Sequence, residues 1–195
     1  LHLSLRRQRQ MCIRDRINTN LSLLGSSLLL ACLAFSTFSY SKEIIISPGD
    51  DSQERLQEAM ILMSEGDTLV IKSGYYSFED GLSLDVDNVI ITGEGMDKTI
   101  LDFKDQKSGA QGLLVTSDKV TLKDFAILDA KGDALKVIGT KGINMINLRT
   151  EWTGGPKSSN GAYGFYPVES EDVLIDGCVA IGASDAGIYV GQSKN

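Results

Sequence analysis

Short apolar stretches recur along residues 89–178 with a constant internal spacing. The segments NVIITG, KVTLKDF, GINMINL and DVLIDGC align without gaps. The alignment gives three apolar columns: Val89, Val120, Ile143 and Val173; Ile91, Leu122, Met145 and Ile175; and Phe125, Leu148 and Cys178. Only the first segment departs from the third column, with Glu94. Residues two apart in a strand share a face, so each segment predicts a strand with one buried face.

A second type of strand recurs between these segments and once more after the last of them. It reads GLLV, ALKV, GFYP and GIYV, starting at Gly112, Ala134, Gly164 and Gly187, which gives spacings of 22, 30 and 23 residues. Two strand types in a fixed order, repeating about every 22 residues, predict a parallel solenoid with one lengthened turn. An antiparallel β-sandwich is the alternative, but it does not account for that order. Alternation within the second type predicts an inner ladder of Leu113, Leu135, Phe165 and Ile188.

One amphipathic helix is expected before the repeats. Asp51 or Ser52 is a suitable N-cap, and Gly66 marks the end. The apolar positions follow helical spacing: Leu56, Ala59, Met60 and Met63. We expect this helix to cap the N-terminal end of the solenoid. The chain ends at GQSKN, where a further strand is expected, so we predict a C-terminally truncated solenoid of four to five turns.

The first 16 residues are expected to have a different origin from the rest. The segment RRQRQMCIRDR, residues 6–16, is compatible in frame with a common transposase-type sequencing-library adapter. We therefore interpret residues 1–16 as an adapter artefact and exclude them from the fold.

Residues 17–41 are typical of an export signal. LSLLGSSLLLACLAF is followed by small residues and then by charge at Lys42 and Glu43. It suits a signal peptide cleaved after Ser41, or a lipoprotein signal that anchors the chain through a lipid on Cys32. Either one predicts a bacterial protein that is periplasmic, secreted or held in the outer envelope. The domain proper is then residues 42–195.

The net charge argues against one class of partner, the nucleic acids. Without residues 1–41 the chain holds 14 basic and 25 acidic residues, a net charge of about −11. Nucleic acid is therefore not expected as a partner, because phosphate binding needs basic patches. Only Cys178 remains in the domain, as a small core residue, so no intrachain disulfide is expected. There is no metal-ligand spacing and no phosphate-binding glycine loop, so we expect neither metal nor cofactor.

The repeats resemble the right-handed parallel β-helix, or pectin-lyase-like, superfamily. The resemblance covers residues 42–195 and implies an all-β single-stranded solenoid with an N-terminal capping helix. In that superfamily polysaccharide often lies along one face. The outward residues of the second strand type predict such a strip: Leu114, Lys136, Tyr166 and Tyr189. The longer loop RTEWTGGPKSSNGAYG is expected beside it, bringing Arg149 and Trp152 as further substrate-binding residues, unless Trp152 folds back into its own loop.

A local resemblance sharpens the candidate chemistry. YGFYPVES, Tyr163 to Ser170, resembles the YGFDPHE motif of the mannuronan C5-epimerases, and KGDAL resembles their lysine and aspartate one turn earlier. The resemblance implies catalytic roles for Lys131, Asp133 and Tyr163, and substrate binding for Glu169. Tyr166 and Val168 stand where that family has aspartate and histidine. Four further candidates, Asp129, Asp133, Asp176 and Asp185, occupy positions typical of turns.

Two functions follow as hypotheses. In the first, the protein is an exported β-helix that binds polysaccharide through the aromatic strip without catalysis. In the second, it is a polysaccharide lyase, C5-epimerase or glycoside hydrolase whose remaining catalytic residues lie in missing C-terminal turns. Turnover of a glycan distinguishes the second from the first.

Overall fold

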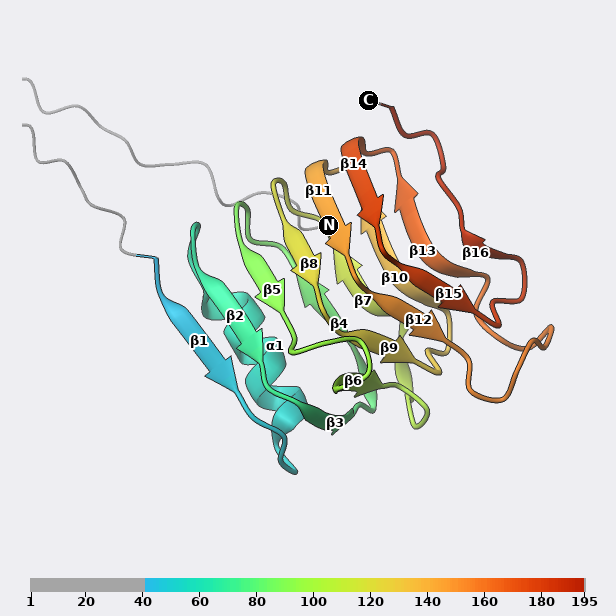
Figure 1. Ribbon diagram of the computed structural model, residues 1–195, viewed down its shortest axis with the longest axis horizontal. Helices are drawn as coiled ribbons and strands as arrows, with labels where there is room; N and C mark the ends of the chain where they lie inside the picture. Colours follow the sequence, from blue (N-terminus) through green and yellow to red (C-terminus); the bar gives the residue numbers. More distant parts are fainter. Residues whose placement is uncertain (1–40, 195) are drawn as a thin grey trace, which may run out of the picture. The chain divides into compact units, whose positions relative to one another are not determined.

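The computed structural model describes residues 41–194, which form a stack of parallel strands in three sheets (Figure 1). One sheet has six strands in the order β1-β2-β5-β8-β11-β14. Its strands are β1 (Glu43–Ile46), β2 (Thr68–Ile71), β5 (Ile90–Thr92), β8 (Thr121–Lys123), β11 (Lys141–Ile146) and β14 (Glu171–Asp176). We call it the six-stranded sheet. The predictions for residues 1–40, including the adapter, the export signal and Cys32, lie outside the described residues.

Two five-stranded sheets complete each turn of the solenoid. We call the first of them the front sheet because it carries the residues discussed below, although it lies behind the six-stranded sheet in Figure 1. The front sheet consists of β4 (Asp80–Leu84), β7 (Ser108–Val115), β10 (Asp133–Ile138), β13 (Tyr163–Val168) and β16 (Ala186–Ile188). The short-stranded sheet consists of β3 (Gly74–Ser77), β6 (Thr99–Asp102), β9 (Ala126–Leu128), β12 (Arg149–Glu151) and β15 (Val179–Ile181). Every strand pair in these sheets is parallel, which makes the fold a parallel β-helix, as predicted.

The predicted inner ladder is confirmed by the register of the front sheet. Leu113 pairs with Leu135, Leu135 pairs with Phe165, and Phe165 pairs with Ile188. The ladder extends one turn further back than predicted, because Leu82 pairs with Leu113. All of these side chains are buried except Ile188, which is 47 % exposed in the last described turn.

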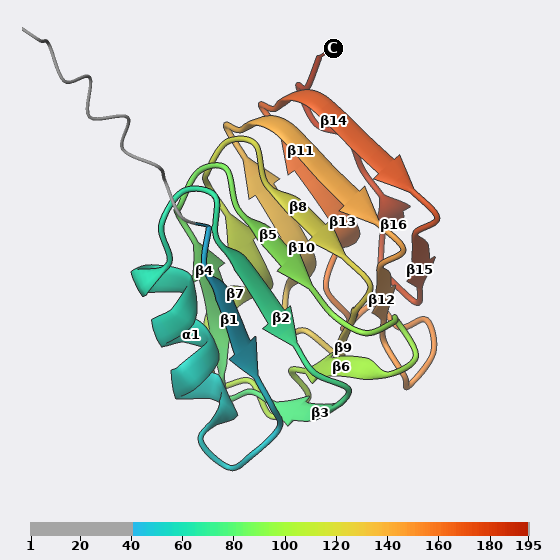
Figure 2. The same ribbon diagram turned by 60° about the vertical axis from the view of Figure 1, so that its left-hand side comes forward.

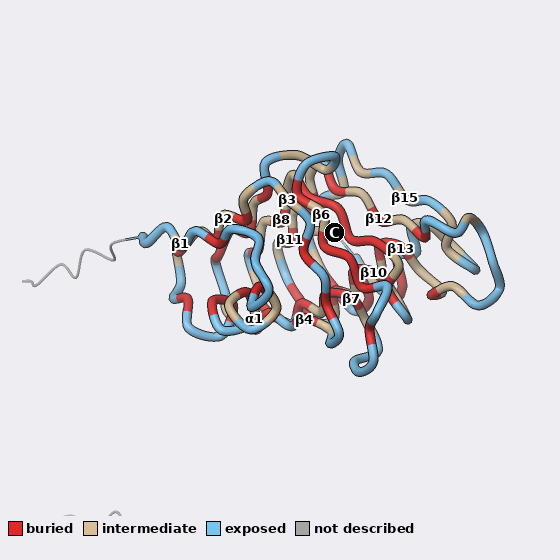
Figure 3. Tube along the Cα trace, turned by 90° about the horizontal axis from the view of Figure 1, so that it is seen from below, coloured by how far each residue is buried: buried red, intermediate tan, exposed pale blue. Residues whose placement is uncertain are grey.

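The columns of the six-stranded sheet are confirmed in the same way. Ile91 pairs with Leu122, Leu122 with Met145, and Met145 with Ile175. The first three side chains are fully buried, so successive turns share one continuous apolar core (Figure 3). Dispersion and the hydrophobic effect over this stack stabilise the solenoid, because a single turn cannot bury its own apolar face.

The short-stranded sheet was not recognised as a separate strand type from the sequence. Its strands β9, β12 and β15 are three residues long and follow the six-stranded sheet almost at once. A three-residue strand gives too few positions for an alternating pattern to be visible. As a result Arg149, predicted in a loop, begins β12 and pairs with Ala126 and Val179.

The helix α1 (Ser52–Leu62) packs against β4, β1 and β3 at the N-terminal end of the solenoid (Figure 2). The predicted apolar face of Leu56, Ala59, Met60 and Met63 is buried. Asp51 occupies the N-cap position without a side-chain capping bond, and the Ser52 hydroxyl bonds Gly49 instead. The helix thus covers the end of the stack, as expected. No helix among residues 41–194 has both the length and the apolar character needed to span a membrane.

Candidate functional site

The predicted outward strip is formed on the front sheet. Lys136 lies between Leu114 on β7 and Tyr166 on β13, in register with both. Tyr189 follows on the next turn, where its backbone N–H donates to the Phe165 carbonyl at 2.9 Å. Because strand residues alternate between faces, the inward Phe165 leaves its neighbour Tyr166 on the outer face. The strip therefore presents one cation and two aromatic rings from three successive turns.

Tyr163 joins these rings, so that three tyrosines form one group. The rings of Tyr163 and Tyr189 are stacked, with centroids 4.7 Å apart and an interplanar angle of 15°. Tyr166 lies 4.6 Å from Tyr163 and 5.5 Å from Tyr189 in tilted orientations. We call Tyr163, Tyr166 and Tyr189 the tyrosine cluster. Aromatic pairs at these separations contribute about 0.5–1.5 kcal/mol each beyond their burial.

The cluster has a cation on one side. The Lys136 ammonium lies 5.1 Å from the centroid of the Tyr166 ring, within the range of a cation–π interaction. This contact holds the lysine over the aromatic surface. The sequence placed Tyr163 in a separate group with Lys131 and Asp133. Its part in the cluster was missed, because Tyr163 and Tyr166 are three residues apart and strict strand alternation would place them on opposite faces.

Asp133 is half-buried next to the cluster. The backbone N–H of Tyr163 donates to its Oδ1 at 3.3 Å. Burial raises the pKa of this carboxyl, and the Tyr163 N–H and the charge of Lys136 oppose the rise. On the other side, partial burial and the nearby Asp185 carboxylate raise the pKa of the Tyr163 phenol. Asp185, expected only as a turn residue, thus flanks the cluster as well.

Lys131 points toward the neighbouring turn of the chain. Its backbone N–H donates to the Oε1 of Gln106 at 2.9 Å, and its Nζ lies 3.5 Å from the Lys107 carbonyl. Among residues 41–194, no hydrogen bond or ion pair joins Lys131 to Asp133 or Tyr163. The structure therefore brings Asp133 and Tyr163 together directly and leaves Lys131 at the edge of the group.

The structure corrects the interpretation of Trp152 as an open sugar platform. Its side chain is 5 % exposed, and its indole N–H donates to the Ala130 carbonyl at 2.7 Å. Because the ring packs into the core and its one polar atom is satisfied, Trp152 fixes the start of the long loop. This is the folded-back arrangement named above as the alternative.

Arg149 and Glu169 are also away from the strip. Arg149 lies on the short-stranded sheet, where it pairs with Glu151 at 3.2 Å and donates to the Met96 carbonyl at 3.2 Å. Glu169 occupies the turn after β13 with a φ of 52°, and its N–H donates to Gly191. Asp129 is likewise a turn residue: its φ is 51° and its two carboxylate oxygens accept from Thr153.

A cleft of about 680 Å³ lies at the corner between the short-stranded sheet and the front sheet. Three of its lining residues are lysines from three successive turns: Lys104, Lys131 and Lys157. Phe103 and Trp152 give it an apolar side, and Asn160 and Thr153 give it polar groups. The sequence identified Lys131 and Trp152 as site residues, and the loop predicted beside the strip also contains Thr153, Lys157 and Asn160. Phe103 and Lys104 were missed, because the path of the turns that brings them here is not visible in a strand pattern.

Within the described part of the chain, no group of three His, Cys, Asp or Glu side chains is arranged to hold a metal ion. Cys178 is a free, half-buried thiol whose Sγ lies 3.4 Å from the Met145 carbonyl, and burial raises its pKa. It occupies the inner column predicted for it.

Neither the known family models nor the curated proteins give a match to this sequence. Solved structures do. An alginate lyase from Paenibacillus sp. str. FPU-7 superposes with a TM-score of 0.53 at 12 % identity, covering 78 % of this chain and 65 % of that one. A pectin methylesterase variant in complex with a hexasaccharide gives 0.47 at 12 % identity, covering 70 % and 48 %. An alginate lyase of the PL6 family, AlyGC, gives 0.47 at 17 % identity, covering 73 % and 20 %.

This chain therefore spans about half of the pectin methylesterase and less than two thirds of either lyase. At such identities the similarity concerns the fold. The parallel register of all three sheets and the superposition on the Paenibacillus lyase agree on one architecture. The described chain has the right-handed parallel β-helix fold.

Proposed function

We propose that this protein binds polysaccharide on the outer face of its front sheet, through the tyrosine cluster and Lys136. The observation that carries the proposal is the packing of three tyrosine rings within 4.6–5.5 Å of one another on the solvent side of β13 and β16. Tyr189 is 41 % exposed, so part of this aromatic surface is open.

The chemistry of the face suits a sugar. Aromatic rings offer flat apolar surfaces against which the C–H faces of a pyranose ring pack, and tyrosine hydroxyls add a polar handle. Lys136 adds three N–H donors for hydroxyl or acidic groups of the glycan. A β-sheet holds these groups at fixed positions, so little conformational entropy is lost on binding. The rise from turn to turn, about 4.8 Å, lets an extended chain contact successive turns.

Binding by the wild-type chain and by Tyr189→Ala tests the proposal, using isothermal titration against neutral and acidic oligosaccharides. We expect wild-type binding and about a tenfold loss in Tyr189→Ala, the scale of one aromatic contact. Tyr75→Ala is the matched control, because Tyr75 is 57 % exposed on β3, in the short-stranded sheet. Equal losses in both variants would refute a specific role for the cluster.

A second candidate function is catalysis on the bound glycan. It is favoured by one contact, the Tyr163 N–H on the half-buried Asp133, whose pKa is raised. A half-buried carboxyl with a raised pKa is a suitable group for proton transfer in a lyase, an epimerase or a hydrolase, and the Tyr163 phenol, which lies beside Asp185, is a second candidate. Product analysis after long incubation with alginate, pectin and neutral glycans tests this. Unsaturated, epimerised or shortened products that disappear in Asp133→Asn would establish it, and intact glycan would exclude it for those substrates.

Export also remains a proposal, which the apolar segment before Lys42 supports. A polysaccharide partner is consistent with a periplasmic, secreted or envelope-bound protein. Fractionation of cells that express the full gene distinguishes a cleaved signal from a lipid anchor on Cys32.

A further inference from the structure

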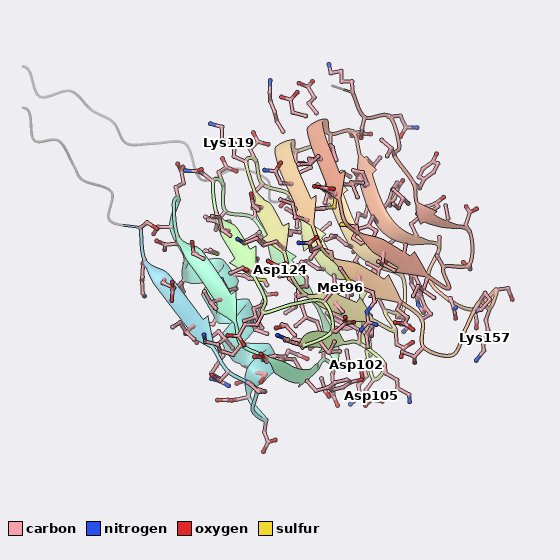
Figure 4. The ribbon with its side chains drawn as sticks, viewed as in Figure 1. Met96, Asp102, Asp105, Lys119, Asp124 and Lys157 are labelled. Carbon is pink, nitrogen blue, oxygen red and sulfur yellow. The ribbon has the colours of Figure 1, made fainter. Side chains whose placement is uncertain are left out.

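The lysine cleft between the short-stranded sheet and the front sheet is a basic site in an acidic protein. Residues 42–195 carry 14 basic and 25 acidic side chains, yet three lysines converge on this one cleft. They come from the turn after β6, the turn after β9 and the loop after β12. Figure 4 shows Lys157 on that loop. Successive turns rise by about 4.8 Å, so the three turns that carry these lysines span about 10 Å along the axis of the solenoid.

In the described part of the chain, the three lysines of the cleft are not neutralised by ion pairs with carboxylates. Among residues 41–194, Lys104, Lys131 and Lys157 form no ion pair, whereas Lys72, Lys107, Lys141 and Lys194 each do. Asp129 is the one acidic residue that lines the cleft. Its oxygens are already bonded to the backbone N–H of Thr153 at 2.7 Å and to the Thr153 hydroxyl at 2.5 Å. The lining of the cleft therefore carries three ammonium groups and one carboxylate, a net charge of 3 − 1 = +2.

The frame of the cleft is rigid. Gln106 is 8 % exposed and ties two turns together: its Nε2 donates to the Ser108 and Gln111 carbonyls, and its Oε1 accepts from the Lys131 N–H. On the opposite side the buried indole of Trp152 is bonded to Ala130. These bonds fix the backbone from which two of the lysines extend.

The cleft also adjoins the tyrosine cluster along the chain. Lys131 lies two residues before Asp133, which accepts from the Tyr163 N–H. The loop that carries Lys157 leads directly into Tyr163, and Gly161 of that loop packs so closely on the Gly132 carbonyl that a Cβ there would lie 1.7 Å from its oxygen. A chain seated on the cluster can thus place a substituent in the cleft.

We propose that the cleft of Lys104, Lys131 and Lys157 binds the acidic substituents, carboxylate or sulfate ester, of the glycan that lies on the tyrosine cluster. This inference rests on the proposed function. Ammonium groups pair with either anion through charge-assisted hydrogen bonds, and the polar side chains of Thr153 and Asn160 also line the cleft. It also accounts for how a chain with a net charge of about −11 would accept a polyanion: the site is locally basic.

Four titrations of the full chain test this. The probes are oligogalacturonate, its fully methyl-esterified form, a sulfated galactan oligosaccharide and its desulfated form. We expect at least one acidic form to bind about tenfold or more tightly than its neutral counterpart, with an advantage that shrinks as salt is added. The arm that shows the preference identifies the acidic group as carboxylate or sulfate.

Two triple variants distinguish binding by the cleft from a general effect of net charge. Lys104→Ala/Lys131→Ala/Lys157→Ala is expected to lose the acidic preference while it keeps neutral binding. The control, Lys98→Ala/Lys119→Ala/Lys123→Ala, has the same net charge but changes lysines outside the cleft. Equal binding of acidic and neutral forms, or equal losses in both triple variants, overturns the inference and leaves the proposed function standing. If none of the four probes binds the wild-type chain, both fail.

Discussion

The side-chain amide of Gln57 pairs with the backbone of Ser83 as a neighbouring strand would. Its Oε1 accepts from the Ser83 N–H at 2.9 Å, and its Nε2 donates to the Ser83 carbonyl at 3.0 Å. One helical turn earlier, the Oε1 of Gln53 accepts from the N–H groups of Glu79 and Asp80, and its Nε2 donates to the Asp80 carboxylate. Since β4 is an edge strand of the front sheet, α1 satisfies polar groups that would otherwise template further strands.

The variant Gln57→Ala should therefore lose both stability and protection of the edge. We expect the free energy of unfolding to fall by about 1–2 kcal/mol, the scale of two partly exposed hydrogen bonds. Aggregation at high concentration should also increase, because the β4 backbone becomes available for pairing. Chemical denaturation and light scattering measure the two effects. Glu58→Ala is the control, since Glu58 is an exposed neighbour on α1; an equal effect there would contradict the capping role of Gln57.

Trp152 should behave as a structural residue. We expect Trp152→Phe to cost about 1–3 kcal/mol, because the Ala130 carbonyl loses its donor in a buried place, and Trp152→Ala to cost about 3–5 kcal/mol. Thermal unfolding measures both. Folded Trp152→Phe should keep neutral glycan binding within about twofold, a change of less than 1 kcal/mol. A large loss of binding with little loss of stability would instead make the ring a sugar platform.

Glu94 should make the stability of the fold depend on pH. Its carboxylate accepts from the Ser73 hydroxyl and N–H and from Lys72, and these bonds lower its pKa from 4.5 to about 2. Because the folded pKa lies below the unfolded one, the stabilisation is complete above about pH 4.5 and is lost as pH falls toward 2. By denaturation, the free energy of unfolding of Glu94→Gln should be lower than that of wild type at pH 7, and the difference should disappear at about pH 2. A difference that does not change with pH would contradict an origin in the ionised Glu94 carboxylate.

The contribution of Asp133 to the stability of the fold should change with pH in the opposite direction to that of Glu94. Burial raises its pKa above the usual 3.8, so ionisation of this carboxyl costs stability. The cost is absent below about pH 3.8, grows as the pH rises from there, and is complete above the folded pKa. Asp133→Asn keeps an oxygen to accept from the Tyr163 N–H and removes the charge. We expect it to be as stable as wild type or more so at pH 7, and the difference to vanish below about pH 3.8. A less stable Asp133→Asn at pH 7 would mean that the carboxylate supports the fold, which would weaken its candidacy for proton transfer.

The sequence predicted the stack and its register because both depend on a period of two. Leu113, Leu135 and Phe165 could be aligned from alternation alone, and the lengthened turn changed the spacing without changing the face. Tyr166 and Tyr189 followed from the same rule. These are the positions where local pattern and packing agree.

What could not be predicted depends on the path of turns and loops. Arg149 was placed in a loop because β12 is too short to show alternation, and the register with Ala126 puts it on another sheet. Trp152 turns inward because the Ala130 carbonyl of the turn below needs a donor. The convergence of Lys104 and Lys157 with Lys131 likewise requires the three turns to be superposed in space.

The most direct measurement is the structure of the full chain with an oligosaccharide that binds it in the titrations. The account predicts a sugar ring against the exposed tyrosines, with the glycan running across β10, β13 and β16 and any acidic group toward the lysine cleft. A glycan bound on the six-stranded sheet or the short-stranded sheet, with the tyrosine cluster untouched, would contradict it.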